Sequence, residues 1–245
     1  PEFLRGLTNP EDLARCPNSD WIVTSGHSAF MPDPQGHIYL VNIRTREWED
    51  LLPSRVELAL DRARYGDVSP PELGIFDAHG LSLRPGPGDV HTIYVVNHGG
   101  REAVEIFELD CRGSHTKLTW TGAVIMPDWC SANDVAPHPD GGFVVTNLCT
   151  NISENFDVLA SGAPSGNVLH WEGKDKPLKV VPGSELSGPN GVEISADGEW
   201  CFINSWPVRK LVKLSLKKAV QEKYVLDVDF MPRNLTWTGG RRILV

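Results

Sequence analysis

The sequence predicts an all-β protein of the β-propeller class, and three observations point to it. Short runs rich in β-branched and aromatic residues recur along the whole chain. Turn-forming Gly, Pro, Asn and Asp separate these runs. An internal repeat, whose copies begin between 44 and 67 residues apart, recurs along the chain. The length of 245 residues suffices for one large domain, and we expect a single propeller domain over residues 1–245.

The predicted strands are short and rich in valine, isoleucine and aromatic residues, which suit a half-buried pleated surface. Gly, Pro, Asp or Asn bound them. The runs are Trp21–Ser25, Ile38–Ile43, Thr92–Asn97, Glu105–Asp110, Phe143–Asn147, Asn167–Trp171, Cys201–Ser205 and Leu211–Leu216.

Two stretches have helical character. The first is Ser54–Arg64, where Ser54 is a suitable N-cap and the apolar positions are spaced for a helix. The second is the short segment Leu216–Glu222. We expect both to be insertions on an all-β frame.

The repeat is clearest between residues 132–141 and 189–198. Each segment has an early Asn, an apolar strand and an Asp-Gly turn, and a second Asn follows 14 residues after the first. Looser copies begin at Glu11, His79 and Asn234. Repeats of this length with several strands each are typical of propeller blades.

The repeat has a functional consequence, because the innermost strands of a propeller line a central channel. If the first strand of each copy is innermost, its leading polar residues converge there. Carboxylate and amide oxygens that converge in this way suit calcium, which takes 6–8 oxygen ligands. Any one of these residues alone is also explained as an ordinary turn former. The converging set is Glu11, Asp12, His79, Asn133, Asp134, Asn190 and Asn234.

Composition excludes several classes of function. The net charge of −9 makes nucleic acid a poor partner, and no apolar run approaches the length of a transmembrane helix. We expect no signal peptide in this chain, because residues 1–6 lack its pattern. The five cysteines form no CxxC pair, which argues against a zinc site. A Cys130–Cys149 bridge, the compartment and the oligomeric state stay open.

Five separated motifs resemble, in the same order, those of the paraoxonase and SMP-30/gluconolactonase family. An acidic pair, Glu11-Asp12, stands where that family has one. The resemblance runs from about Glu11 to the C-terminus. The motifs are residues 76–82, residues 94–98 with 104–107, residues 133–135, residues 190–192 with 197–198, and residues 234–236.

The resemblance implies a six-bladed propeller with calcium in its tunnel, of which about five blades are represented here. It implies a catalytic calcium ion and a deeper, structural one. His79 would be the general base and His98 its proton-relay partner. The catalytic calcium ligands would be Glu11, Asn133, Asn190 and Asn234, and the structural ligands Asp12, Asp134 and the backbone carbonyl of Leu81.

Three departures from the family pattern bear on these expectations. Arg233 stands where the family has Asp, and a cation beside calcium should weaken the site. Leu148 replaces an acidic residue. The chain ends at Val245 inside the fifth blade, so we expect the propeller to be C-terminally incomplete.

The leading hypothesis is therefore a calcium-dependent hydrolase of small lactones or aryl esters. Calcium would polarise the carbonyl and a histidine would activate water. One alternative is an enzyme like strictosidine synthase, whose chemistry would not need a calcium cage. Another is a non-catalytic propeller that binds a ligand or a protein and is stabilised by calcium.

Overall fold

The computed structural model describes residues 3–28, 35–113, 115–217, 222–238 and 242–245. The chain divides into two compact units, Pro1–Ile125 (unit 1) and Met126–Val245 (unit 2). Nearly all regular structure in the described parts is β-strand. No helix in these parts is long and apolar enough to cross a membrane.

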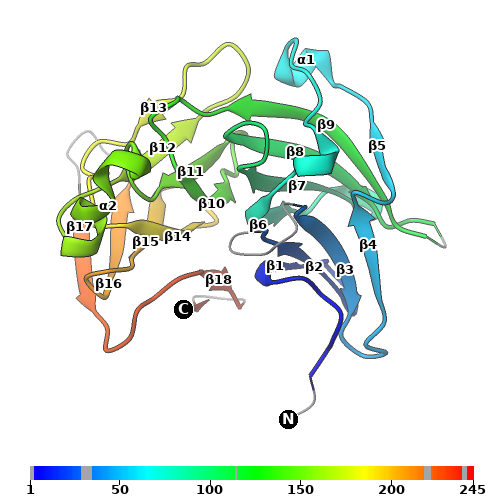
Figure 1. Ribbon diagram of the computed structural model, residues 1–245, viewed down its shortest axis with the longest axis horizontal. Coiled ribbons are helices and arrows are strands. Elements are labelled where there is room, and N and C mark those ends of the chain that lie inside the picture. The colour runs from blue at the N-terminus through cyan, green and yellow to red at the C-terminus, as the bar shows by residue number, and fades with distance from the viewer. Residues whose placement is uncertain (1–2, 29–34, 114, 218–221, 239–241) are drawn as a thin grey trace. The chain divides into compact units, whose positions relative to one another are not determined.

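Unit 1 contains two sheets (Figure 1). The first is an antiparallel meander in the order β1-β2-β3-β4, and the second has the order β5-β9-β8-β7-β6. Two short 3₁₀ turns, Leu73–Ile75 and Pro87–Asp89, flank β6. The elements are β1 (Pro10–Arg15), β2 (Trp21–Gly26), β3 (His37–Asn42), β4 (Trp48–Leu52), β5 (Val56–Leu58), α1 (Arg62–Tyr65), β6 (Ala78–Arg84), β7 (Val90–Asn97), β8 (Ala103–Asp110) and β9 (Lys117–Ile125).

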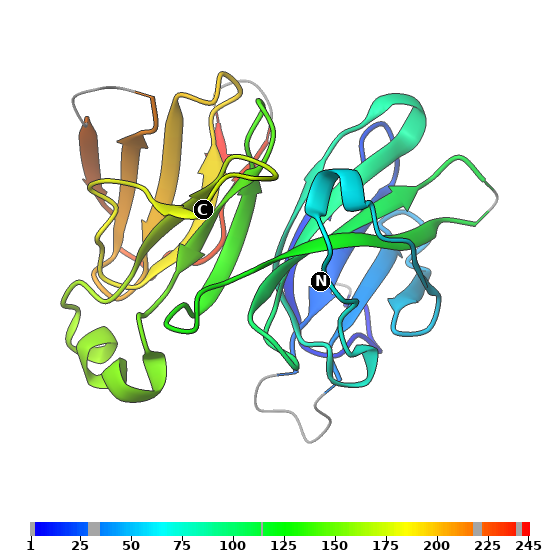
Figure 2. The same cartoon turned by 90° about the horizontal axis from the view of Figure 1, so that it is seen from above.

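Unit 2 contains two further four-stranded meanders, β10-β11-β12-β13 and β14-β15-β16-β17, and the two-stranded pair β18-β19. The helix α2 connects β11 to β12 and lies at one end of these strands (Figure 2). The elements are β10 (Ala132–Pro137), β11 (Phe143–Asn147), α2 (Ile152–Ser161), β12 (Asn167–Trp171), β13 (Lys179–Val180), β14 (Pro189–Ile194), β15 (Trp200–Ser205), β16 (Lys210–Ser215), β17 (Lys223–Asp227), β18 (Thr236–Trp237) and β19 (Ile243–Leu244).

Apolar side chains of neighbouring sheets form the core of each unit. In unit 1, Val23, Leu40, Ile93 and Phe107 belong to one fully buried cluster. In unit 2, residues from β10, β11, β12, β14, β15 and β16 form another, again dominated by valine, leucine and isoleucine. The strands bury these side chains between sheets, which explains the β-branched runs of the sequence.

All eight strands predicted from the sequence are present, within two residues at each end. Within each unit, the first strands of successive meanders are neighbours: β1 lies beside β6, and β10 lies beside β14. Within each unit, the first strand of one copy is therefore a neighbour of the first strand of the next copy.

The helix predicted over Ser54–Arg64 is wrong. Val56–Leu58 forms β5, which pairs in parallel with β9, and only Arg62–Tyr65 is helical. The N-cap is Asp61, whose carboxylate accepts a hydrogen bond from the Arg64 N–H at 3.1 Å. Tertiary pairing with the edge of β9 overrides the local helical spacing.

The second predicted helix lies partly outside the described residues, since 218–221 are not described; Leu216 and Lys217 form a bend. Gly239-Gly240, a glycine pair typical of turns in the repeat copy that begins at Asn234, also lies outside the described residues. The helix α2 was not predicted from the sequence. Its signals are Asn151 before the first helical residue and Gly162 as a left-handed C-cap.

The 14-residue spacing in the repeat does not make Asn147 and Asn204 equivalent. Asn147 pairs with Ala132, whereas the residue that pairs with Pro189 is Ser205. The β14–β15 hairpin holds one more residue than the β10–β11 hairpin. Asn204 is therefore displaced by one position, and a one-residue shift moves a side chain to the other face of a strand.

All five cysteines are unbridged thiols in the structure, including Cys130 and Cys149. Four of them are buried and Cys111 is partly exposed. The structure therefore contains no Cys130–Cys149 bridge.

Candidate functional site

The first strands of four meanders share one irregularity at the predicted site positions. In β1, β6, β10 and β14 the register shifts near the start, so that two residues oppose one on the next strand. Such a β-bulge re-aims the side chains it contains. The bulged pairs are Glu11-Asp12, His79-Gly80, Asn133-Asp134 and Asn190-Gly191.

The two bulge aspartates link neighbouring first strands in the same way. The Asp12 carboxylate accepts hydrogen bonds from the N–H groups of Leu13 at 2.8 Å and Leu81 at 2.9 Å. In unit 2, Asp134 accepts from the N–H groups of Val135 and Val192, each at 2.7 Å. Both aspartates are buried. Each carboxylate thus ties its own strand to the first strand of the next blade.

His79 and His98, predicted as base and relay, are in direct contact. His79 Nδ1 lies 2.9 Å from His98 Nε2, and His79 Nε2 lies 3.2 Å from the Glu11 carboxylate. His98 Nδ1 lies 2.9 Å from the Glu102 carboxylate. The four side chains form a continuous hydrogen-bonded chain, Glu11–His79–His98–Glu102.

Counting protons assigns the state of this chain. Each of its three hydrogen bonds needs one proton, and ionised carboxylates supply none. The two imidazoles together therefore hold three protons when both glutamates are ionised. One ring is then a cation, and the other is neutral.

The surroundings of the two rings decide which is the cation. Burial lowers the pKa of His98, but the hydrogen bond and charge of Glu102, with the charge of Asp77, outweigh it and raise that pKa above its ordinary value. Burial lowers the pKa of His79, and His98 and His27 lower it further against the effect of Glu11. His98 is thus the cationic ring, and His79 is neutral with its proton on Nε2.

A third histidine, for which no role was predicted from the sequence, completes the cluster. The ring of His27 stacks on that of His79 with centroids 4.4 Å apart and planes 1° apart. Its Nδ1 lies 2.9 Å from the Asp77 carboxylate. No role was predicted for His27, Asp77 or Glu102. Asp77 stands in the motif of residues 76–82, whereas the only signal of His27 and Glu102 is proximity in sequence to β2 and His98.

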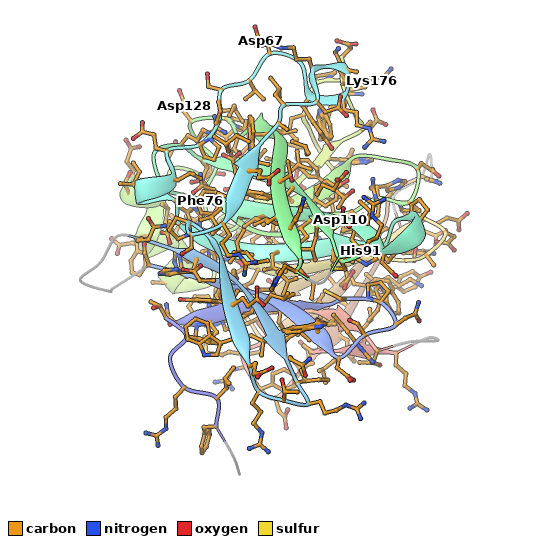
Figure 3. All side chains as sticks on the ribbon, turned by 90° about the vertical axis from the view of Figure 1, so that its right-hand side faces the viewer. Asp67, Phe76, His91, Asp110, Asp128 and Lys176 are labelled. Atoms are coloured by element: carbon orange, nitrogen blue, oxygen red, sulfur yellow. The ribbon has the colours of Figure 1, made fainter. Side chains whose placement is uncertain are left out.

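A buried ion pair supports the segment that carries His98 and Glu102. Arg101 donates two hydrogen bonds to the Glu105 carboxylate, at 2.7 and 2.8 Å, and Glu105 is fully buried. Trp120 Nε1 donates to the same carboxylate at 2.8 Å. Phe76 lies at one end of this blade, and His91 and Asp110 at the other (Figure 3). The register places His79 and the Arg101 turn at the Phe76 end.

The predicted ligands in unit 2 come from successive strands. Asn133 and Asn190 are buried in the bulges of β10 and β14, and the Thr146 hydroxyl donates to the Asn190 carbonyl at 2.6 Å. The Gly191 N–H donates to the Arg233 carbonyl at 2.8 Å, which holds the segment before β18 against β14. The exposed Arg233 residue thus contributes its carbonyl, and Asn234 follows directly.

The donor chemistry of these asparagines fits a hard cation. The side-chain oxygen of Asn190 is buried and has no hydrogen-bond partner among the described residues. A buried amide oxygen without a partner is costly, and an ion or ordered water that binds it removes that cost. The described residues contain no metal-binding group of three or more His, Cys, Asp or Glu. A cation here would therefore take part of its ligands from amide oxygens, as calcium can.

Two cavities in the described parts of unit 2 lie away from these residues. The larger, about 370 Å³, lies beside α2 and is lined by Thr150, Val158 and Asn167 among others. The smaller, about 180 Å³, contains His138 and His170. Neither is lined by a predicted site residue.

Comparison with known proteins gives one curated relative. No family model matches the chain. The chain is similar to serum paraoxonase/arylesterase 2 from Gallus gallus, with 26% identity over 210 residues that cover 82% of this chain and 54% of the relative. The chain thus spans about half the length of the relative it matches.

Solved structures resemble the chain at low sequence identity. A chain of a nidogen/laminin complex matches with a TM-score of 0.58 and 13% identity, over 94% of this chain and 69% of that chain. A protein from Lactobacillus plantarum matches with a TM-score of 0.54 and 16% identity, over 96% of this chain and 60% of that chain. A candidate 6-phosphogluconolactonase from Bacteroides uniformis matches with a TM-score of 0.52 and 12% identity, over 92% of this chain and 59% of that chain.

At these identities the likeness concerns the fold alone. It confirms the predicted all-β propeller fold, of which four blades are described as sheets of four or five strands. The number of six blades stays a prediction.

Proposed function

We propose that the chain hydrolyses small lactones or aryl esters and uses calcium as its cofactor. The observation that carries this proposal is the cluster of three imidazoles and three carboxylates in unit 1. Hydrolysis of an ester needs a base that takes a proton from water and returns it to the leaving oxygen. The similarity to a paraoxonase/arylesterase supports this class of substrate.

Within the cluster, the side chains divide into proton carriers and groups that fix them. The sequence assigns proton acceptance to His79 and relay to His98, and their 2.9 Å contact supports a shared proton path. Glu102 orients His98 and keeps it charged. A cationic imidazolium near the reacting carbonyl would also favour the negative charge that develops on its oxygen.

The proposed catalytic calcium ligands are Asn133, Asn190 and Asn234 of unit 2, with Glu11 as the further ligand that the repeat predicts. Asp12, Asp134 and the Leu81 carbonyl are proposed for a second, structural ion. When bound, calcium would polarise the substrate carbonyl as a Lewis acid. Neutral amide ligands cancel none of the charge of a cation, which suits that task.

The test is hydrolysis of phenyl acetate and of small aliphatic lactones by the purified chain, with calcium and after thorough chelation. We expect hydrolysis that chelation abolishes and added calcium restores. No hydrolysis of either substrate class with calcium present would reject the hydrolase and favour a binding propeller. Full activity after chelation would reject the calcium requirement alone.

A further inference from the structure

His27 and Asp77 form a largely buried pair that further hydrogen bonds hold in place. His27 follows β2 directly and Asp77 precedes β6. The Asp77 carboxylate faces His27 Nδ1 at 2.9 Å and accepts the Ser28 N–H at 2.6 Å, while the Asp77 N–H donates to the Asn97 side-chain oxygen at 2.9 Å. The side chains of His27 and Asp77 are only 17% and 14% exposed.

This arrangement fixes the tautomer of His27. An ionised carboxylate accepts only, so the Nδ1 of His27 carries the proton and Nε2 keeps its lone pair. Among the described residues no side chain or backbone group is hydrogen-bonded to that Nε2. A histidine oriented through Nδ1 by a buried aspartate, with Nε2 open, has the arrangement of a general base.

His79, in contrast to His27, has no ring nitrogen that is open to a water molecule. Both of its ring nitrogens are engaged, Nδ1 with His98 and Nε2 with Glu11. The parallel stack at 4.4 Å brings the His27 ring against the same site. His79 therefore offers a flat face that sets the plane of His27, whereas His27 offers the open nitrogen.

We propose that His27, oriented by Asp77, is the base that takes the proton from the attacking water; this inference rests on the proposed hydrolysis. Water oxygen bonds to the carbonyl carbon as one O–H proton passes to His27 Nε2. The carbonyl π pair moves onto its oxygen. When that pair returns, the bond from carbon to the leaving oxygen breaks, and the leaving oxygen takes the proton from Nε2. Water and ester become acid and alcohol, and His27 is neutral again.

Asp77 and His79 are positioning residues in this scheme. Asp77 fixes the Nδ1 proton and holds the positive charge that His27 carries between the two steps. His79, as the stacked neighbour, limits rotation of the His27 ring. Loss of either should reduce kcat more than it changes KM, since neither group need touch the substrate.

The kinetic test compares His27→Gln, His79→Gln and Asp77→Asn with wild type on phenyl acetate and a small lactone. We expect His27→Gln to lose about 10²–10⁴-fold in kcat, and the other two to lose less. His37→Gln is the matched control, because His37 also pairs through Nδ1 with an aspartate, Asp50, at 3.2 Å, and is 19% exposed. It should keep wild-type rates.

A chemical test separates this inference from the proposed function. Diethyl pyrocarbonate acylates neutral imidazole nitrogens that have a free lone pair, and peptide mass spectrometry locates the product. His27 should react before His79 and His98, whether or not the chain hydrolyses either substrate. Earlier reaction of His79, or a larger kcat loss in His79→Gln than in His27→Gln, would overturn the assignment and return the base to His79. Wild type without hydrolase activity would reject the base role and the proposed function together.

Discussion

Three histidines of the same cluster have different chemistry because each faces a different carboxylate. His98 faces Glu102 and is the cation. His79 lies between Glu11 and His98, and both of its nitrogens are engaged. His27 faces Asp77 and keeps one nitrogen open. Roles in proton transfer follow from these partners rather than from the residue type.

Asp77 makes the stability of unit 1 depend on pH. Burial raises its pKa, but hydrogen bonds from His27 and Ser28 outweigh burial and hold the pKa at about 2. Because this folded-state pKa lies below the unfolded value of about 3.9, ionised Asp77 adds about 2 kcal/mol to the free energy of unfolding. That contribution is fully present above about pH 5 and is lost as the pH falls through about 2.

We therefore expect Asp77→Asn to be less stable than wild type at pH 6 and to lose less stability on acidification. Urea unfolding at pH 6 and pH 2.5 measures both effects. Asp67→Asn, at an exposed carboxylate (Figure 3), is the control and should follow wild type. Equal pH dependence in wild type and Asp77→Asn would contradict the assignment of the low pKa to Asp77.

Cys111 should be the most reactive thiol of the native chain. A hydrogen bond from Cys16 lowers the pKa of Cys111, with burial opposing and Thr116 assisting. The hydrogen bond to Cys111, together with burial, raises the pKa of Cys16, and burial raises that of Cys201. Thiolates are the reactive form, so iodoacetamide at neutral pH should label Cys111 first. Mass spectrometry of the peptides measures the order; equal labelling of Cys201 in folded protein would refute it.

At the residue scale, motifs predicted His79 and His98, and the structure brings them together. They could be found because each stands in a motif that resembles the paraoxonase family, residues 76–82 and residues 94–98. Asp77 stands in the same motif as His79, but the motif gave it no role. His27 and Glu102 stand in no motif, and they meet His79 and His98 only because the loops next to β2, β6 and β7 come together in the fold. A carboxylate near a histidine in sequence is too common to be a signal by itself.

At the scale of elements, the residue patterns of the sequence were sufficient to locate strands but not to locate helices. Buried strands carry long apolar runs that the sequence displays directly. Val56 and Leu58 also suit a helix, and only the free edge of β9 makes them a strand. The bulges were beyond prediction, because one extra residue in a pairing depends on the partner strand.

The buried Arg101–Glu105 pair should matter far more than an exposed pair of the same kind. Arg101→Ala leaves the Glu105 charge buried without its cation, which costs about 3–5 kcal/mol. Arg112 pairs with Asp110 at the exposed end of the same strand, and Arg112→Ala should leave stability unchanged within error.

Urea unfolding of the two variants compares two pairs whose carboxylates, Glu105 and Asp110, lie on the same strand, β8. Arg101 stands between His98 and Glu102 in the sequence, and its side chain is bound to Glu105. We therefore also expect Arg101→Ala to reduce hydrolysis more than Arg112→Ala does. Equal unfolding free energies for both variants would show that the buried pair adds nothing.

For the whole molecule, the repeat was the informative feature of the sequence. It predicted the blades, and the structure shows that the polar residues it aligned lie in the bulges of four first strands. It did not predict the register of Asn204, because a hairpin one residue longer preserves the spacing and changes the pairing. The convergence of residues from separate blades is a prediction from the repeat, and the calcium proposal rests on that prediction.

Calcium should stabilise the native chain, because ligands from separate blades are assembled only on folding. Free calcium at 100 times its dissociation constant should add about 2.7 kcal/mol to the free energy of unfolding, measured by urea unfolding with and without a chelator.

Asn190→Ala removes the buried, unpartnered oxygen and should abolish this gain. Asn167→Ala is the matched control, since the Asn167 oxygen is also buried and unpartnered but lies beside α2. Arg233→Asp should tighten calcium binding, because a carboxylate replaces a cation next to Asn234. Identical unfolding curves of wild type in calcium and in chelator would reject the proposed site.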